Sequence, residues 1–205
     1  LNPNRSGPVK AALIFGNPDL GDPRFDLPNA ETEARLIAGM TAGSQVLLRK
    51  DATVAAFKKL APGFRYVHIA SHGEFNPTDA LQSRLLLSGA NLDAGSLTVG
   101  DLYNTQLDAD LITLSACETG LGKVLTGDDV MGLTRGFLYA GANNIVASQW
   151  KVDDLATSQL MRSFYEYLHK GVNKRDALRQ AQVDTLREFP QPFFWAAFYL
   201  TGLGR

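Results

Sequence analysis

The single cysteine of the chain, Cys117, ends an apolar run and precedes a glycine-rich stretch, in LITLSACETGLG. A second residue capable of chemistry, His72, ends another apolar run and is followed by Gly73, in YVHIASHG. A cysteine thiolate is a strong nucleophile, and a nearby imidazole can take its proton and later protonate a leaving amine. The pair therefore predicts nucleophilic catalysis by a thiol, provided that the fold brings the two residues together.

The backbone around this pair could bind an oxyanion. Glycine lets the chain approach a ligand closely, so we expect the N–H groups of Gly73 and Cys117 to form an oxyanion hole. The alternative for Cys117 is a small buried apolar residue, and the alternative for His72 is a hydrogen-bonded loop histidine. We expect His68 to pack or to face the neighbouring layer, and His169 to complement a helix C-terminus, so neither has a predicted catalytic role.

The elements that must position the pair alternate between short apolar runs and longer amphipathic stretches. This alternation predicts an α/β fold with a mostly parallel sheet and helices on both faces. Ligands bind at the carboxyl ends of the strands in such sheets, so His72 and Cys117 should share one edge, about 5 Å apart if their strands are neighbours. The predicted strands are 10–16, 45–50, 65–71, 83–89, 110–116, 143–150 and 193–202, and the predicted helices are 27–40 (capped by Asn29), 53–61, 127–142, 153–171 and 173–189.

Composition excludes several classes of function. The formal net charge is −1 and the basic residues are dispersed, which argues against nucleic acid as a direct partner. No apolar run approaches the roughly 18 residues of a membrane span, and no zinc spacing, Walker A loop or serine elbow is present, so we expect no membrane association, metal or cofactor. One cysteine allows no intrachain disulfide, which fits a reducing, cytoplasmic location.

The start of the chain, LNPNRSGP, is rich in proline and asparagine and begins with Leu1. We interpret residues 1–8 as a linker from an upstream region, or as a processed N-terminus, and residues 9–205 as one domain.

Several stretches resemble a known family. YVHIASHGEF and LITLSACETGLG resemble the caspase-like cysteine peptidases, although the glutamine before Ala-Cys of true caspases is missing. A more specific resemblance is to the CHAT domain, the caspase-like module that commonly follows tetratricopeptide repeats in bacterial proteins. It is carried by HIASHG, LSACETGLG, GDDVMGLTRGFLYAGANNIVASQWKVDD, SFYEYLHKG, ALRQAQ and PFFWAAFYLTG, in this order along nearly the whole chain.

The resemblance implies a caspase-like three-layer α/β sandwich and cleavage of peptide bonds. It makes His72 the general base and acid, Cys117 the nucleophile and Gly73 an oxyanion donor. It also implies an upstream tetratricopeptide-type region, which we expect to control the loops 73–83 and 118–129. One departure from the family pattern is Gln149, where the family has leucine in Ser-Leu-Trp.

A specificity pocket is expected close to the segment WKVDD. This segment resembles Trp-Asp-Val-Thr-Asp of separase, a caspase-like peptidase that cleaves after arginine. A buried guanidinium requires a carboxylate partner, so Asp154 is the first candidate for binding a basic P1 residue, with Asp153 beside it and Trp150 as a pocket wall. Glu118, like Asp128 and Asp129, could supply the carboxylate instead. The alternative is that Asp153 and Asp154 only cap a helix and that Trp150 only packs.

The sequence thus predicts a caspase-like cysteine endopeptidase that cleaves a protein or peptide partner. Two other hypotheses stay open. The first is a caspase-like scaffold that binds partners without cutting them, and the second is a Cys/His enzyme of acyl transfer or amidase chemistry.

Overall fold

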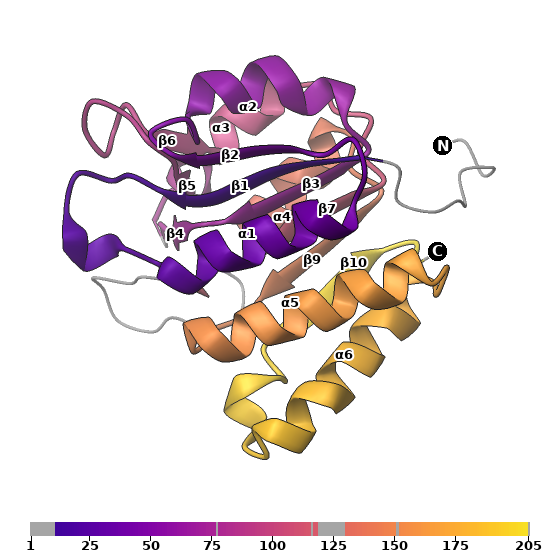
Figure 1. Ribbon diagram of the computed structural model, residues 1–205. Coiled ribbons are helices and arrows are strands. Elements are labelled where there is room, and N and C mark those ends of the chain that lie inside the picture. Colours follow the sequence, from indigo (N-terminus) through magenta and orange to yellow (C-terminus); the bar gives the residue numbers. More distant parts are fainter. Residues whose placement is uncertain (1–10, 77, 116, 119–129, 151, 205) are drawn as a thin grey trace.

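The computed structural model describes residues 11–76, 78–115, 117–118, 130–150 and 152–204, with the backbone alone for 117–118 and 130–131 (Figure 1). The predicted linker, residues 1–8, lies outside this part of the chain. A six-stranded sheet has the order β10-β9-β7-β3-β1-β2, and its strands are parallel except for β10. The strands of this sheet are β1 Ala12–Pro18, β2 Gln45–Arg49, β3 Tyr66–Ala70, β7 Leu111–Leu114, β9 Asn144–Ser148 and β10 Phe198–Gly202.

The central strands are buried on both faces, as is usual for strands of a parallel sheet. Every residue of β1, β3, β7 and β9 is buried. A strand that must be covered on both sides suits a parallel sheet, whose crossover helices pack on its two faces. The predicted α/β class with a mostly parallel sheet is therefore confirmed.

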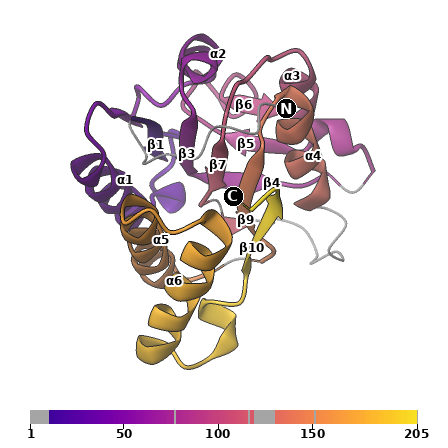
Figure 2. The ribbon, with the colours of Figure 1, turned by 90° about the vertical axis from the view of Figure 1, so that its right-hand side faces the viewer.

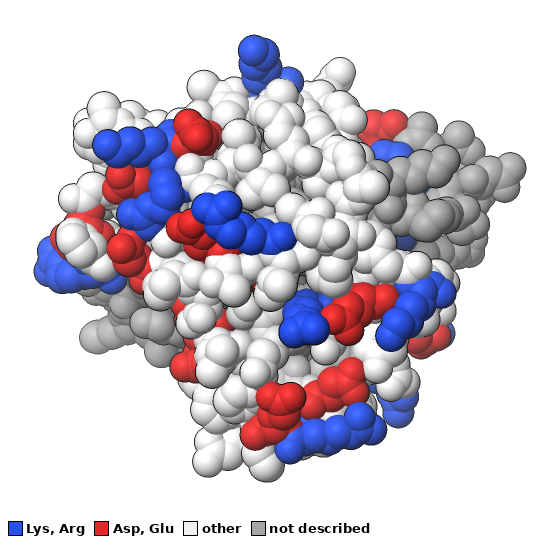
Figure 3. Space-filling view, in the orientation of Figure 1, with Lys and Arg blue, Asp and Glu red and all other residues white. Residues whose placement is uncertain are grey.

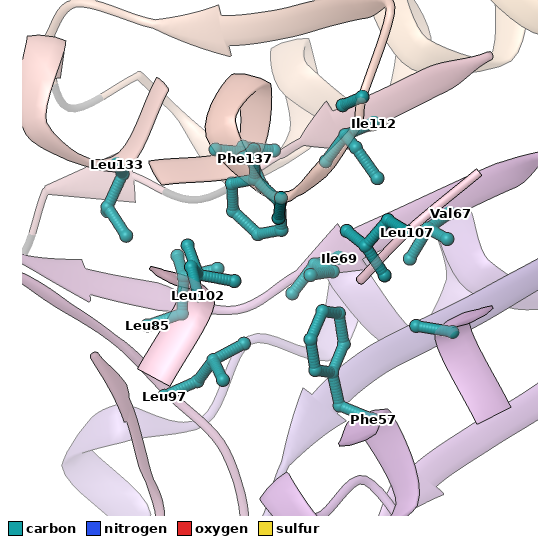
Figure 4. Close-up of a cluster of buried hydrophobic side chains, with 14 of the residues drawn as sticks. Phe57, Val67, Ile69, Leu85, Leu97, Leu102, Leu107, Ile112, Leu133 and Phe137 are labelled. Atoms are coloured by element: carbon teal, nitrogen blue, oxygen red, sulfur yellow. The ribbon is translucent and has the colours of Figure 1, made fainter. Parts of the chain in front are cut away.

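Helices form an outer layer on each side of this sheet, as the view along the strands shows (Figure 2). On one face, α1, α5 and α6 enclose an apolar cluster that includes Ile14, Ile37 and Phe164. On the other face, α2, α3 and α4 enclose a second cluster around Phe57, Val67 and Phe137 (Figure 4). The helices are α1 Pro28–Met40, α2 Val54–Leu60, α3 Val99–Tyr103, α4 Val130–Ala140, α5 Asp154–His169 and α6 Lys174–Glu188, with 3₁₀ turns η1 Pro23–Phe25, η2 Ala61–Gly63, η3 Ala80–Gln82 and η4 Pro192–Phe194.

A small second sheet continues two strands of the first. Its order is β6-β5-β4-β8, with β4 at His72–Glu74, β5 at Arg84–Leu86, β6 at Ser96–Thr98 and β8 at Cys117–Glu118. β4 follows β3 after one residue, and β8 follows β7 after two. The two neighbouring strands β3 and β7 therefore lead directly into the neighbouring strands β4 and β8.

The structure corrects two local predictions. Asn29 is not the cap of α1, because the helix begins at Pro28 with Leu27 as its N-cap and no side-chain cap bond. Proline is favoured in the first turn since it has no N–H to satisfy there. The last strand begins at Phe198 rather than at 193, because residues 192–194 form a 3₁₀ turn that starts with Pro192.

Charged side chains of both signs alternate over the face seen in Figure 3. Within the described ranges, no helix is both long and apolar enough to cross a membrane.

Candidate active site

The backbones of His72 and Cys117 lie side by side. They are register partners in the parallel pair β4–β8, and Gly73 is paired with Glu118 in the next position. Neighbouring strands are about 4.8 Å apart, so the two residues are within reach of each other. The pairing is a continuation of the main sheet, where β3 and β7 are paired from Tyr66 to Ile69 and the Ser115 amide then donates to the Ile69 carbonyl at 2.9 Å.

The imidazole of His72 is buried, with 5% of the residue exposed. Its Nε2 lies 2.8 Å from the carbonyl oxygen of Phe25, and the Phe25 ring meets the imidazole edge-on at a centroid distance of 5.7 Å. A carbonyl oxygen can only accept a hydrogen bond, so Nε2 carries the hydrogen. In the neutral ring, Nδ1 is then the basic nitrogen.

The strand that carries His72 is held on both sides. β4 pairs antiparallel with β5, which places His72 opposite Leu86 and Glu74 opposite Arg84. The Ser71 hydroxyl donates to the Leu86 carbonyl, and Arg84 Nε binds Glu74 Oε2 at 2.7 Å. These contacts fix the direction in which β4 leaves β3, and with it the position of His72.

The acidic residues expected to form a P1 pocket lie at the start of α5, and each has a partner. Asp153 is the N-cap of α5, and its Oδ1 accepts from the amides of Leu155 and Ala156 at 3.0 and 3.1 Å. The Oδ2 atom of Asp154 accepts from the backbone N–H of Asn29 at 3.0 Å, which joins α5 to the start of α1. One carboxylate oxygen of Asp154 is thus hydrogen-bonded to the backbone of another helix.

The other predicted pocket residues differ in what the structure describes. Trp150 is half-buried, packs against the α1–α5–α6 cluster and donates from Nε1 to the Phe193 carbonyl at 3.0 Å. The side chain of Glu118 lies outside the description, as do Asp128, Asp129 and most of the loop 118–129.

A buried pair beneath the strand ends was missing from the predicted site. His68 Nε2 lies 2.6 Å from Glu33 Oε1, and both residues are almost completely buried, at 0% and 1% exposure. His68 therefore faces the helical layer, one of the two outcomes expected for it. Glu33 could have been found from its spacing, because it shares the buried face of α1 with Ala30, Ala34 and Ile37.

Burial raises the pKa of the Glu33 carboxyl above its ordinary value, and the negative charge of Asp154 adds to this, while the hydrogen bond and charge of His68 oppose it. The Ser115 hydroxyl also faces Glu33 and lowers its pKa, although it completes no hydrogen bond of good geometry in the described part of the chain. The Glu33–His68 pair thus lies between α1 and β3, next to Ser115, which is two positions before Cys117 in the sequence.

A three-layer α/β fold that pairs a histidine and a cysteine on neighbouring strand ends defines the class of caspase-like proteins. The CHAT domain family model matches residues 2–203, so the chain belongs to the CHAT domain family. Tetratricopeptide repeat protein 28 of Homo sapiens and that of Mus musculus are each 27% identical to it over 241 aligned positions, which cover 98% of this chain. The chain spans 10% of the length of these two relatives.

Two solved structures share this fold. The Saccharomyces cerevisiae separase–securin complex superposes with a TM-score of 0.61 at 12% identity, over 95% of this chain and 12% of that one. The Arg-specific cysteine proteinase gingipain R superposes with a TM-score of 0.60, also at 12% identity, over 95% of this chain and 46% of that one. The expected caspase-like architecture is therefore confirmed.

Proposed function

We propose that this chain is a caspase-like cysteine endopeptidase domain that cleaves a protein partner with a Cys117/His72 dyad. The observation that carries the proposal is the register pairing of the two residues on β4 and β8, together with the bond from His72 Nε2 to the Phe25 carbonyl. This bond leaves Nδ1 as the base, and a base held in one tautomer is what a thiol nucleophile requires.

The reaction follows from these roles. His72 Nδ1 takes the thiol proton, and the Cys117 sulfur attacks the carbonyl carbon of the scissile bond. The N–H groups of Gly73 and Cys117 stabilise the oxyanion. When the C–N bond breaks, the imidazolium gives its proton to the leaving amine, and a thioester remains on Cys117. Water, deprotonated by His72, then hydrolyses the thioester and restores the thiol.

We further propose a basic P1 preference, with Asp154 as the acid that selects it. Its Oδ2 is bound by the Asn29 amide, a contact that fixes the carboxylate and leaves Oδ1 for a guanidinium or ammonium group. Asp153 also has one carboxylate oxygen bound by backbone amides, those of Leu155 and Ala156, so it is the second candidate, and Trp150 and Glu118 complete the proposed pocket. Gingipain R, which shares the fold, is an Arg-specific cysteine proteinase, and this supports a search for the same preference here.

An upstream tetratricopeptide-type region is proposed to regulate the domain, by analogy with the repeat proteins that it matches. A ligand that binds this region would increase or decrease the fraction of molecules in which the loops 73–83 and 118–129 are arranged for catalysis. The cleavage rate of residues 9–205, expressed alone, should then differ from that of the same sequence joined to such a region, and equal rates would refute the regulation.

The experiment that tests the peptidase is covalent labelling of Cys117 by peptidyl electrophiles, combined with cleavage of a peptide library that displays every P1 residue. Labelling should depend on His72 and on the peptide, and should be lost in Cys117→Ala. Labelling without cleavage of any peptide or protein would favour the scaffold. Turnover of small amides or esters without peptide cleavage would favour an amidase or acyl transferase.

A further inference from the structure

The segment between β1 and α1 passes directly over His72. We call residues Asp19–Leu27 the strap, and it is seen at the left of Figure 1, where the chain turns from the end of β1 to the start of α1. The strap contains the 3₁₀ turn η1 and ends one residue before α1. It provides two contacts of the His72 ring, because the Phe25 carbonyl oxygen lies on Nε2 and the Phe25 ring meets the imidazole in a T-shaped arrangement.

Two residues outside the strap hold it at its ends. Asn17 Oδ1 accepts from the Leu27 amide at 2.9 Å, and Asn17 itself is buried, at 4% exposure. The guanidinium of Arg49, the last residue of β2, binds Asp26 at 2.5 Å and lies 4.0 Å from Asp19. The bonds to Leu27 and Asp26 thus attach the two residues that follow Phe25.

The backbone at both anchors is strained. Asn17 and Arg49 have φ angles of +46° and +51°, and they are the only residues other than glycine with positive φ in the described part of the chain. Asparagine tolerates this region better than most residues, but arginine does not, and such a conformation costs about 1 to 2 kcal/mol. Strain of this kind persists when surrounding contacts fix it and is concentrated at functional sites, and here both strained residues anchor the strap.

We propose that Asn17 and Arg49 are positioning residues for His72, which act through the strap by holding the Phe25 carbonyl on Nε2. The inference rests on the proposed role of His72 as the base. Without the anchors, the carbonyl would move and the imidazole could adopt either tautomer. The fraction of molecules with a basic Nδ1 would then fall, and the rate of the chemical step would fall with it.

The test compares variants that release the strap with variants that do not. Asn17→Gly removes the acceptor for Leu27 while relieving the strained φ, and Asp26→Ala removes the carboxylate that Arg49 binds at an exposed position. Asn17→Asp keeps the acceptor. Asp22→Asn also removes one negative charge from the strap. It should not release the strap, because the partner of the Asp22 carboxylate, Arg24, lies within the strap. All four are compared by circular dichroism to verify the fold.

The primary measurement is the tautomer of His72 by long-range ¹H–¹⁵N NMR. The chain has three histidines, so His68 and His169 are internal references. We expect the Nε2–H tautomer in the wild type, Asn17→Asp and Asp22→Asn, and a mixture of tautomers in Asn17→Gly and Asp26→Ala. The releasing variants should also lower kcat about tenfold with KM within about twofold, as expected for a lost orientation of the base.

A single Nε2–H tautomer in both releasing variants, with the fold retained, would overturn the proposal. This outcome is separate from failure of the proposed function. If the wild-type chain cleaves nothing, the peptidase is refuted, whereas the tautomers of His72 still decide whether the anchors position the ring.

Discussion

His72 and Cys117 are paired residues of adjacent parallel strands, although 45 positions separate them in the chain. The pairing depends on the apolar strands β3 and β7, which run side by side and lead into β4 and β8.

Replacement of either member of the pair should remove most of the peptidase activity. Cys117→Ala eliminates the nucleophile, and His72→Ala should lower kcat by about 10² to 10⁴, the range expected for loss of a general base. Steady-state cleavage of a peptide substrate measures both. The double variant should be no slower than Cys117→Ala, because the two residues act as a unit. A His72→Ala variant with wild-type kcat would exclude the dyad.

Asp154→Asn should abolish a preference for Arg or Lys at P1 while the fold is retained. The amide oxygen of asparagine can still accept from the Asn29 N–H, so the variant removes the charge but not the contact between α5 and α1. We expect the ratio of kcat/KM for Arg over Leu at P1 to fall at least tenfold. A hydrogen bond to a charged group contributes about 1.5 kcal/mol, which corresponds to about this factor. The matched control is Asp153→Ser, which keeps a capping side chain. If Asp153→Ser changes the ratio and Asp154→Asn does not, the acid has been assigned to the wrong residue.

The Glu33–His68 pair should make stability depend on pH. Burial raises the pKa of Glu33 above its ordinary 4.5, so the carboxyl binds its proton more tightly in the folded chain than in the unfolded chain. This contribution to stability is complete below pH 4.5 and is lost as the pH rises through the folded-state pKa. Glu33→Gln keeps an acceptor for His68 without the buried charge, so its stability relative to the wild type should increase with pH above about 4.5.

Denaturation with urea between pH 4 and pH 8 measures this difference. The half-buried residue Glu31, which pairs with Arg35 on the same helix, supplies the control Glu31→Gln for loss of one surface charge. A relative stability of Glu33→Gln that decreases as the pH rises would show that the ion pair, rather than desolvation, dominates.

Asp110 should be among the polar residues most important for stability. It is buried at the start of β7, and its Oδ2 lies 3.1 Å from both Lys174 Nζ and the Tyr66 hydroxyl. Asp110→Ala leaves the nearly buried Lys174 ammonium without this partner, so the free energy of unfolding should fall by about 3 to 5 kcal/mol. The control Asp93→Ala breaks an exposed pair with Arg84 and should change it by less than about 0.5 kcal/mol. Equal effects on the denaturation midpoint would contradict the prediction.

Local patterns were sufficient to predict much of the fold. Continuous apolar runs predicted the strands of the parallel sheet, and capping residues such as Asp153 predicted where α5 begins. The failures were also local in origin. Pro28 begins α1 two residues earlier than a cap at Asn29 would require, and Pro192 delays the last strand until Phe198.

The sequence by itself determined which residues could do chemistry, because residue type and the ends of apolar runs single out His72 and Cys117. Only the tertiary structure decided what surrounds them. The Phe25 carbonyl on His72, the Asn29 amide on Asp154 and the Glu33 carboxylate on His68 all join residues more than 30 positions apart. Their partners are set by helix packing and by backbone groups, and a backbone carbonyl is the same at every residue, so no sequence pattern indicates which one will face an imidazole.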